Sequence, residues 1–293
     1  TIFAKRPYSP TQASGFDCFC FIQSEYINNF PSLMSPTLYI RISDTDLCFA
    51  RYEAGREPVF DFSRYRARHH ASLTMNLREA KTQESILQAP IERVEALVVD
   101  AVTVVPLADF QEEDAERFYR HCFAEKQHHR VFYDTVPSAN AVVIFSVEES
   151  VCHTLEDNFE KVHYTSSLKP VVEHFAGLPQ CGGPTKRIYI YCHDQAVDVI
   201  AFDESRLCFL NTFKVLGEKD VAYYVLNAAS SLVTEEKEAA FYVAGEATEA
   251  EAAIKELSRY AANVYAVHPE AEFNRNIVAT TPDVPYDLIT LLL

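Results

Sequence analysis

The segment from Arg187 to Phe213 most constrains the fold, because it predicts three β-strands joined by short turns. Side chains alternate in character along residues 188–192 and again along 197–202, and β-branched and aromatic residues are frequent there, as in strands. Polar residues of turn length separate the three runs. Because apolar residues occur at both alternating positions, we expect a sheet that is covered on both faces.

A fainter copy of this segment lies 150 residues earlier, between Leu38 and Phe62. Aligned without a gap, the two copies share four identical residues: Tyr39 and Tyr189, Ile40 and Ile190, Asp44 and Asp194, and Arg56 and Arg206. Chance alone can produce four identities. The polar breaks also fall at matching positions, and this agreement carries more weight. A repeat at this spacing predicts two related domains rather than a solenoid.

The net charge of −16 argues against a general binder of nucleic acid or of anionic membranes. One local exception is a basic cluster made of Arg64, Arg66, Arg68, His69 and His70. A solvated loop is the favoured interpretation of this cluster, and a patch for phosphate or for an acidic partner is the alternative.

The length and composition indicate a folded protein with two domains of ordinary size. The chain has 293 residues, of which 48% are hydrophobic. No apolar run reaches the roughly 18 residues of a membrane-spanning helix. The first residues lack the apolar core of a signal peptide, although the numbering does not exclude a removed leader.

The eight cysteines are scattered and contain no C-x-x-C pair, which favours free thiols in a reducing, cytoplasmic compartment. We expect Cys192 and Cys208 to be packed in the second sheet, where a free cysteine acts as a small hydrophobe. Adjacent histidines such as His128 and His129 do not suit two ligands on one helix face, so no metal site is predicted.

Helices and strands alternate after each three-stranded segment. Helices are expected at residues 71–88, 111–124, 147–158, 168–175, 217–232 and 248–260, and further strands at 94–105, 130–134, 141–145, 161–165, 239–244 and 263–267. Thr248 and Glu251 fit a capping box. The apolar segment 285–293 is expected to dock on the protein, whereas residues 1–36 give no structural expectation.

The glycine-rich stretch 177–184 is the clearest linker, and it divides the chain into an N-terminal domain, 1–180, and a C-terminal domain, 181–293. A loop within one domain is the alternative. The second half reads βββαβαβ, which predicts an α/β fold with a mixed sheet and helices on both faces. This is the order of the ribonuclease H-like fold, which is duplicated in actin, sugar kinases and heat-shock chaperones. The first half fits the same order with an insertion.

Four blocks carry a closer resemblance: LYIRISDTDLCFARY at 38–52, VVPLADFQEEDAERFY at 104–119, FLNTFKVLGEKDVAYYVL at 209–226 and FYVAGEATEAEAAIKELSRY at 241–260. They resemble an uncharacterised bacterial family of domain-of-unknown-function proteins described as having an actin-like ATPase fold. The resemblance covers roughly residues 38–267. It implies a duplicated actin-like fold and no particular activity.

Members of this superfamily that hydrolyse ATP hold it between two hairpins and a glycine turn. Here the two loops keep Asp44 and Asp194 but lack the glycine that lets backbone N–H groups approach phosphate. The third element retains Gly245 before a helix, which would suit an anion or an ordinary strand-to-helix turn. These three residues form a candidate degenerate nucleotide pocket; simple polar turns are the alternative. No catalytic residue is identified.

Three functions remain open. The favoured one is a non-catalytic protein that binds a protein partner or acts as a scaffold, similar in outline to the actin-like components of pilus and secretion machines. The others are an ATPase or kinase with altered loops, which would use ATP and magnesium, and a binder of another small molecule in the interdomain cleft. We expect no cofactor and no magnesium-dependent ATP hydrolysis.

Overall fold

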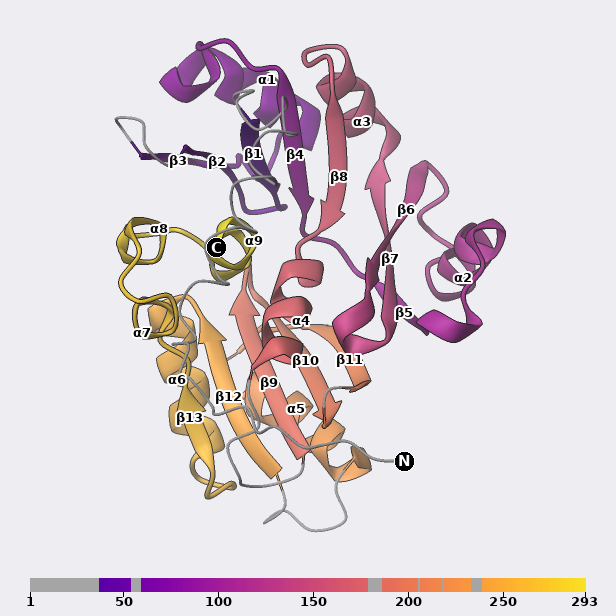
Figure 1. The fold of residues 1–293 in the computed structure, drawn as a ribbon, viewed down its shortest axis with the longest axis vertical. Helices are drawn as coiled ribbons and strands as arrows, with labels where there is room; N and C mark the ends of the chain where they lie inside the picture. Colours follow the sequence, from indigo (N-terminus) through magenta and orange to yellow (C-terminus); the bar gives the residue numbers. More distant parts are fainter. Residues whose placement is uncertain (1–36, 54–58, 179–185, 205, 218, 233–238) are drawn as a thin grey trace, which may run out of the picture. The chain divides into compact units, whose positions relative to one another are not determined.

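The computed structural model describes residues 37–53, 59–178, 186–204, 206–217, 219–232 and 239–293 (Figure 1). The first three-stranded segment forms an antiparallel meander in a five-stranded sheet, and two further strands add in parallel beside β1. The order is β3-β2-β1-β4-β8, with β1 at Thr37–Ile42, β2 at Asp46–Tyr52, β3 at Phe60–Arg66, β4 at Arg93–Val98 and β8 at Val162–Ser166.

The second segment builds a separate sheet with the same topology. Its order is β11-β10-β9-β12-β13, with β9 at Lys186–His193, β10 at Ala196–Asp203, β11 at Arg206–Lys214, β12 at Ala239–Gly245 and β13 at Val264–Ala266. The ribonuclease H-like strand order therefore occurs twice, which confirms the predicted fold. The ungapped correspondence holds for the first two strands only, because β11 begins earlier after its turn than β3 does.

Helices cover both faces of each sheet, as Figure 1 shows. Helices α1 (Leu73–Gln83) and α3 (Glu149–Glu156) pack on one face of the first sheet, and α9 (Tyr286–Leu292) packs on the other. In the second sheet, α5 (Asp220–Leu232) and α6 (Ala247–Leu257) cover one face. Helix α4 (Leu168–Gly177) covers the other, where Phe175 stacks on Tyr189.

The predicted insertion is a small three-stranded sheet between β4 and α3. Its order is β5-β7-β6, formed by Thr103–Pro106, Ala141–Glu148 and His129–Val136, with helix α2 at Ala115–Cys122. Buried Tyr119, Val142 and Ile144 give it a core of its own. The predicted strand 94–105 is thus two strands, β4 and β5, that belong to different sheets.

The C-terminal segment is docked, as predicted: Tyr286, Leu288 and Ile289 of α9 are buried. Two short helices, α7 at Pro269–Glu272 and α8 at Ile277–Thr280, precede it. The predicted capping box is wrong, because Thr248 lies inside α6 and the residue before the helix, Glu246, makes no side-chain cap. None of the described helices is long and apolar enough to cross a membrane.

The five cysteines in the described ranges are free thiols, and Cys18, Cys20 and Cys181 lie outside those ranges. Cys192 is buried in the second sheet as predicted. Cys208 is exposed instead, because it is the extra residue where the register of the edge strand β11 shifts. Residues 36–293 cluster as one compact unit, and the proposed division at 177–184 stays a prediction because 179–185 are not described.

Candidate functional site

The tips of the two matching hairpins touch each other. Ser43 Oγ in the β1–β2 turn donates to Asp194 Oδ1 in the β9–β10 turn at 2.8 Å, and the Thr45 hydroxyl donates to the same oxygen. Asp194 and Gln195 both have positive φ, of 47° and 57°, as a two-residue type I′ hairpin turn requires. The tight turn therefore presents the Asp194 carboxylate to the first hairpin.

Arg41 on β1 is the centre of this contact and is 1% exposed. Its Nη2 lies 2.5 Å from Asp194 Oδ2, its Nε lies 2.8 Å from Asp287 Oδ2, and its Nη1 lies 3.3 Å from Asp46 Oδ1. Burial alone would lower the pKa of Arg41, but Asp287 and Asp194 outweigh it and raise that pKa. One buried guanidinium thus joins the first hairpin, the second hairpin and α9.

His193 extends the network inside the second sheet. Its Nδ1 lies 2.9 Å from Asp194 Oδ2, and its Nε2 lies 2.6 Å from Asp198 Oδ2. Carboxylates only accept, so both ring nitrogens donate and the side chain is an imidazolium. Although burial opposes it, Asp198 with Asp194 raises the pKa of His193 to about 10. Burial would also raise the pKa of Asp194, but Arg41 and His193 reverse this and hold it well below its usual range.

Arg64 forms a second connection between the two sheets. Its Nε donates to Asp46 Oδ2 at 2.9 Å, and its Nη2 donates to Glu246 Oε1 before α6 at 2.6 Å. Arg64 and Arg66 both lie within β3, so the interpretation of the basic cluster as a loop is wrong at these two residues. We call the complete set the junction cluster: Arg41, Ser43, Thr45, Asp46, Arg64, His193, Asp194, Asp198, Glu246 and Asp287.

The structure brings only part of the candidate pocket together. Asp194 is in the junction cluster, whereas Asp44 is exposed at the hairpin tip and its side chain bonds to none of the described residues. The first hairpin contributes Asp46 instead. Sequence reasoning also missed Arg41 and Asp287, whose only signal was a single charge in an otherwise apolar run.

Gly245 ends β12, where it pairs with Cys192 of β9. Its φ is +133°, and a Cβ there would lie 2.1 Å from the Cys192 carbonyl oxygen. The glycine is therefore required by the close approach of two strands. This requirement accounts for Gly245 without an anion.

The fold family implies ATP and magnesium, and the residues of the junction cluster do not fit the phosphates. Ser43 and Thr45 contact Asp194 directly, so the hairpin tips leave no phosphate-sized space between them. The carboxylates of the cluster outnumber its cations, so a polyphosphate would meet negative charge. Within the described ranges, no cluster of His, Cys, Asp and Glu could hold a metal ion.

A cavity of about 490 Å³ does lie beside the second hairpin. It lies between the hairpin end and helices α5 and α6, and it is lined by Cys192, Gln195, Ala196, Val215, Leu216, Gly217, Val221, Thr248, Glu249, Ala252 and Ala253. Its volume falls in the range of small-molecule pockets. All of these residues belong to the second half of the chain, and Gln195 lies in the same turn as Asp194, so this cavity lies next to the contact between the hairpins.

Residues 28–264 match the family model described as protein of unknown function (DUF3822). The chain belongs to this family. No curated protein matches this DUF3822 member.

Two solved structures show the fold of the family member. The first is a protein of Bacteroides thetaiotaomicron VPI-5482 with an actin-like ATPase fold and unknown function; the TM-score is 0.74 at 23% identity, covering 88% of this chain and 95% of that chain. The second comes from the PilM–PilN type IV pilus biogenesis complex, with a TM-score of 0.50 at 12% identity, covering 88% and 97%. Both support the actin-like fold.

Proposed function

We propose that this DUF3822 protein is a non-catalytic, actin-like protein that works by binding a protein partner or by acting as a scaffold. The observation that carries the proposal is the direct contact of the two hairpin tips through Asp194. In ATP-hydrolysing proteins of this fold, the phosphates lie between these hairpins. Here Arg41 and two hydroxyl groups hold the carboxylate instead.

Nucleotide entry between the hairpins would be energetically unfavourable. The Arg41 and Asp194 side chains are 1% and 9% exposed, so separating them would leave two charges without their partners in a poorly solvated place. Breaking one partner from a buried ion pair costs roughly 3–5 kcal/mol. Phosphate binding would have to offset this loss and the repulsion by the remaining carboxylates.

One further observation favours partner binding, and a second bears on where the protein works. The PilM–PilN structure, which shares the fold, is a complex of type IV pilus biogenesis and so contains a protein partner. The free thiols in the described ranges agree with a protein that works in the reducing cytoplasm. The identity of the partner follows from neither observation.

Thermal unfolding with and without ATP and magnesium tests the proposal. A ligand at 100 times its Kd stabilises by about 2.7 kcal/mol, and we expect no such shift and no phosphate release above background. Asp194→Asn should unfold at a lower temperature than the wild type, because it weakens the buried pair with Arg41. Like the wild type, neither this variant nor its exposed control Asp44→Asn should show a shift with ATP or release phosphate. ATP hydrolysis that disappears in Asp194→Asn would contradict the proposal.

The cavity beside the second hairpin supports small-molecule binding as a second candidate, within the second half rather than in an interdomain cleft. Ala252→Phe would place a large side chain in this cavity and obstruct it. A thermal shift with ATP or adenosine that Ala252→Phe abolishes and Asp194→Asn preserves would show binding at the cavity without a phosphate site. No shift with either compound would count against this candidate for nucleosides.

A further inference from the structure

Two edge strands from different sheets line one groove of about 670 Å³. They are β11 of the second sheet and β5 of the insertion, which lie next to each other in Figure 1. The lining consists of Val102, Thr103, Val104, Pro106, Cys122, Phe123, Asn140, Ala141, Arg206, Leu207, Cys208, Phe209, Leu210 and Asn211. No carboxylate is among them, although the chain carries a net charge of −16.

The backbone of β11 has an open edge at this groove. Val215 N donates to Gln195 O at 2.8 Å, which sets the alternation of hydrogen-bonded pairs between β10 and β11. By that alternation, the N–H and C=O groups of Leu210 and Thr212 point away from β10. Thr212 N–H donates to the Asn211 side chain at 3.1 Å, whereas no described residue bonds to the outward backbone groups of Leu210.

The edge of β5 is less suitable for pairing. Leu107 N donates to Asn140 O, so by the same alternation Val104 and Pro106 point their backbone groups outward. Pro106 has no N–H to offer, and proline is a common device that blocks strand edges. A segment that enters the groove would therefore pair with β11 and pack its side chains beside β5.

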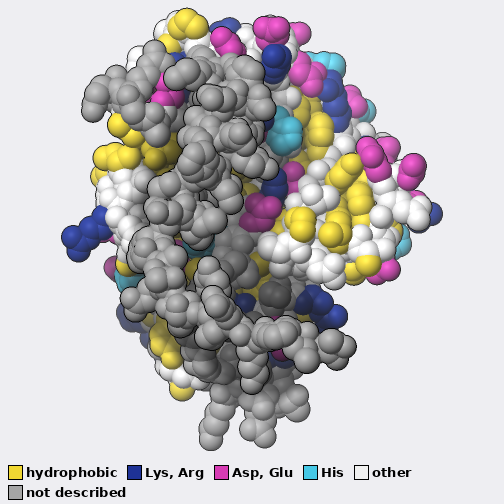
Figure 2. Space-filling model, viewed as in Figure 1, with side chains coloured by type: hydrophobic (Ala, Val, Ile, Leu, Met, Phe, Trp, Pro, Cys, Tyr) yellow, Lys and Arg dark blue, Asp and Glu magenta, His cyan; other side chains and the backbone are white. Residues whose placement is uncertain are grey.

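The charges at the ends of β11 indicate the chemistry of the occupant. Arg206 begins the strand and Lys214 ends it; both are exposed, and neither forms an ion pair with a described residue. Between them, Leu207 and Leu210 are half-buried and pack toward the insertion beside Val104. In Figure 2, acidic side chains gather instead over α2, on the far side of the insertion.

These charges also exclude a second copy of the chain as the natural occupant. Antiparallel pairing of two β11 strands centred on Leu210 would set Arg206 opposite Lys214 of the other copy. Parallel pairing would set each cation beside its own equivalent. Like charges directly opposite one another destabilise strand pairing in either case.

We propose that β11 binds an extended segment of a partner protein by strand addition, with apolar side chains in the groove and acidic residues at the segment's ends. The inference rests on the proposed partner-binding function and names the kind of partner. Main-chain hydrogen bonds to Leu210 supply affinity in this mode, and alternate side chains in the groove supply specificity. Arg206 and Lys214 fix the register of the segment through its acidic ends.

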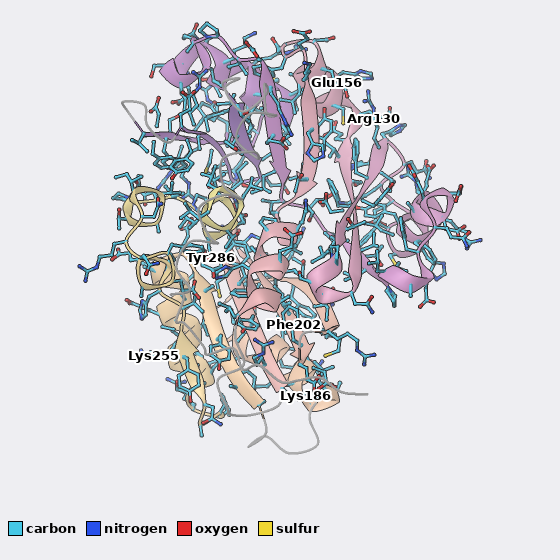
Figure 3. The ribbon with its side chains drawn as sticks, in the orientation of Figure 1. Arg130, Glu156, Lys186, Phe202, Lys255 and Tyr286 are labelled. Carbon is cyan, nitrogen blue, oxygen red and sulfur yellow. The ribbon has the colours of Figure 1, made fainter. Side chains whose placement is uncertain are left out.

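Three variants separate backbone, side-chain and charge contributions. Leu210→Pro removes the outward N–H without removing a hydrogen bond to β10, because proline is tolerated where the N–H faces away from the sheet. Leu210→Ala keeps the N–H and removes the apolar side chain. Lys214→Glu reverses one end charge, and its matched control is Lys255→Glu on α6, which Figure 3 shows away from β11.

Selection of random displayed peptides on the full-length wild-type protein tests the proposal. We expect enriched peptides with alternating apolar residues flanked by Asp or Glu. Fluorescence anisotropy should show that Leu210→Pro binds about tenfold more weakly, or worse, because it loses one main-chain hydrogen bond and disturbs the neighbouring pairing. Lys214→Glu should weaken binding severalfold, and Lys255→Glu should leave it unchanged.

Two outcomes overturn the inference: no enriched peptide, or enriched peptides that bind Leu210→Pro and Lys214→Glu as tightly as the wild type. If Leu210→Pro fails to fold in thermal unfolding, the comparison of Lys214→Glu with Lys255→Glu decides alone. The result is independent of the nucleotide test. ATP binding would contradict the proposed function but not the strand addition at β11. A failed selection would contradict the strand addition but not the absence of a nucleotide site between the hairpins.

Discussion

At the scale of single residues, Arg41 determines which charges the interior of the protein can hold. Its three carboxylate partners come from three separate parts of the chain, and two of them, Asp46 and Asp287, are almost fully buried. An unpaired charge in such a place is strongly unfavourable. Each buried charge of the cluster is therefore paired with an opposite charge. The pKa of each ionisable member depends on the protonation state of the others.

His193 makes this dependence measurable as a function of pH. Its folded-state pKa of about 10 lies above the ordinary value near 6.5. Its contribution to stability is therefore complete below about pH 6.5 and is lost as pH rises toward about 10. At roughly 1.4 kcal/mol per pKa unit, the loss is on the order of a few kcal/mol.

We expect the free energy of unfolding, measured with urea, to fall between about pH 6 and about pH 10 in the wild type. His193→Gln should be less stable near pH 6 and should show a much smaller fall. His163→Gln, which removes an exposed histidine paired with Glu95, is the matched control. Parallel pH profiles for wild type and His193→Gln would show that the imidazolium assignment is wrong.

At the scale of helices and strands, local patterns predicted most elements and failed where tertiary contacts decide. Period-two alternation of side-chain character identified both meanders, because successive side chains of a strand point to opposite faces of the sheet, both of which are covered here. The same pattern could not show that residues 94–105 divide between two sheets, because both pieces are apolar. Nor could it show that Cys208 is exposed, since the bulge that exposes it depends on the register with β10.

The candidate site was less predictable for a related reason. Arg41 and Asp287 are 246 positions apart, and no local period connects them. Asp44 matched Asp194 in the repeat, yet Asp46 is the buried carboxylate, because Asp44 lies in the exposed turn whereas Asp46 begins β2 and points into the protein. Gly245 was found by its position before a helix, and its steric role became evident only from β9.

Gly245 gives a prediction about the pairing of β9 and β12. Gly245→Ala places a methyl group 2.1 Å from the Cys192 carbonyl oxygen and forces a side chain into a φ of +133°. Backbone strain of this kind costs about 1–3 kcal/mol. The steric clash adds to it, so we expect a larger loss than this in the free energy of unfolding. Gly177→Ala is the control, because it meets no atom within 4 Å and should be neutral or slightly stabilising. Equal stabilities of the two variants would refute the steric argument.

At the scale of the whole described chain, the two sheets are held together by the junction cluster and by a shared apolar core. Tyr286 of α9, labelled in Figure 3, stacks on Phe175 of α4 and lies beside Tyr191 of β9. The next residue, Asp287, pairs with Arg41 of β1. A short C-terminal helix thus links both halves of the duplicated fold, which is consistent with a scaffold that keeps one arrangement.

Asp287→Asn tests whether α9 helps to hold the two sheets together. The amide removes one negative charge from Arg41 while Asp194 and Asp46 remain, so we expect a loss on the order of 3 kcal/mol in the free energy of unfolding. Because the contact spans both sheets, amide hydrogen exchange should accelerate in β1 and β9 together. Asp283→Asn, in the exposed loop before α9, is the matched control, since asparagine also tolerates the positive φ of 64° found there. Faster exchange confined to α9 would mean that the helix end frays on its own and that Arg41 holds the two sheets together without it.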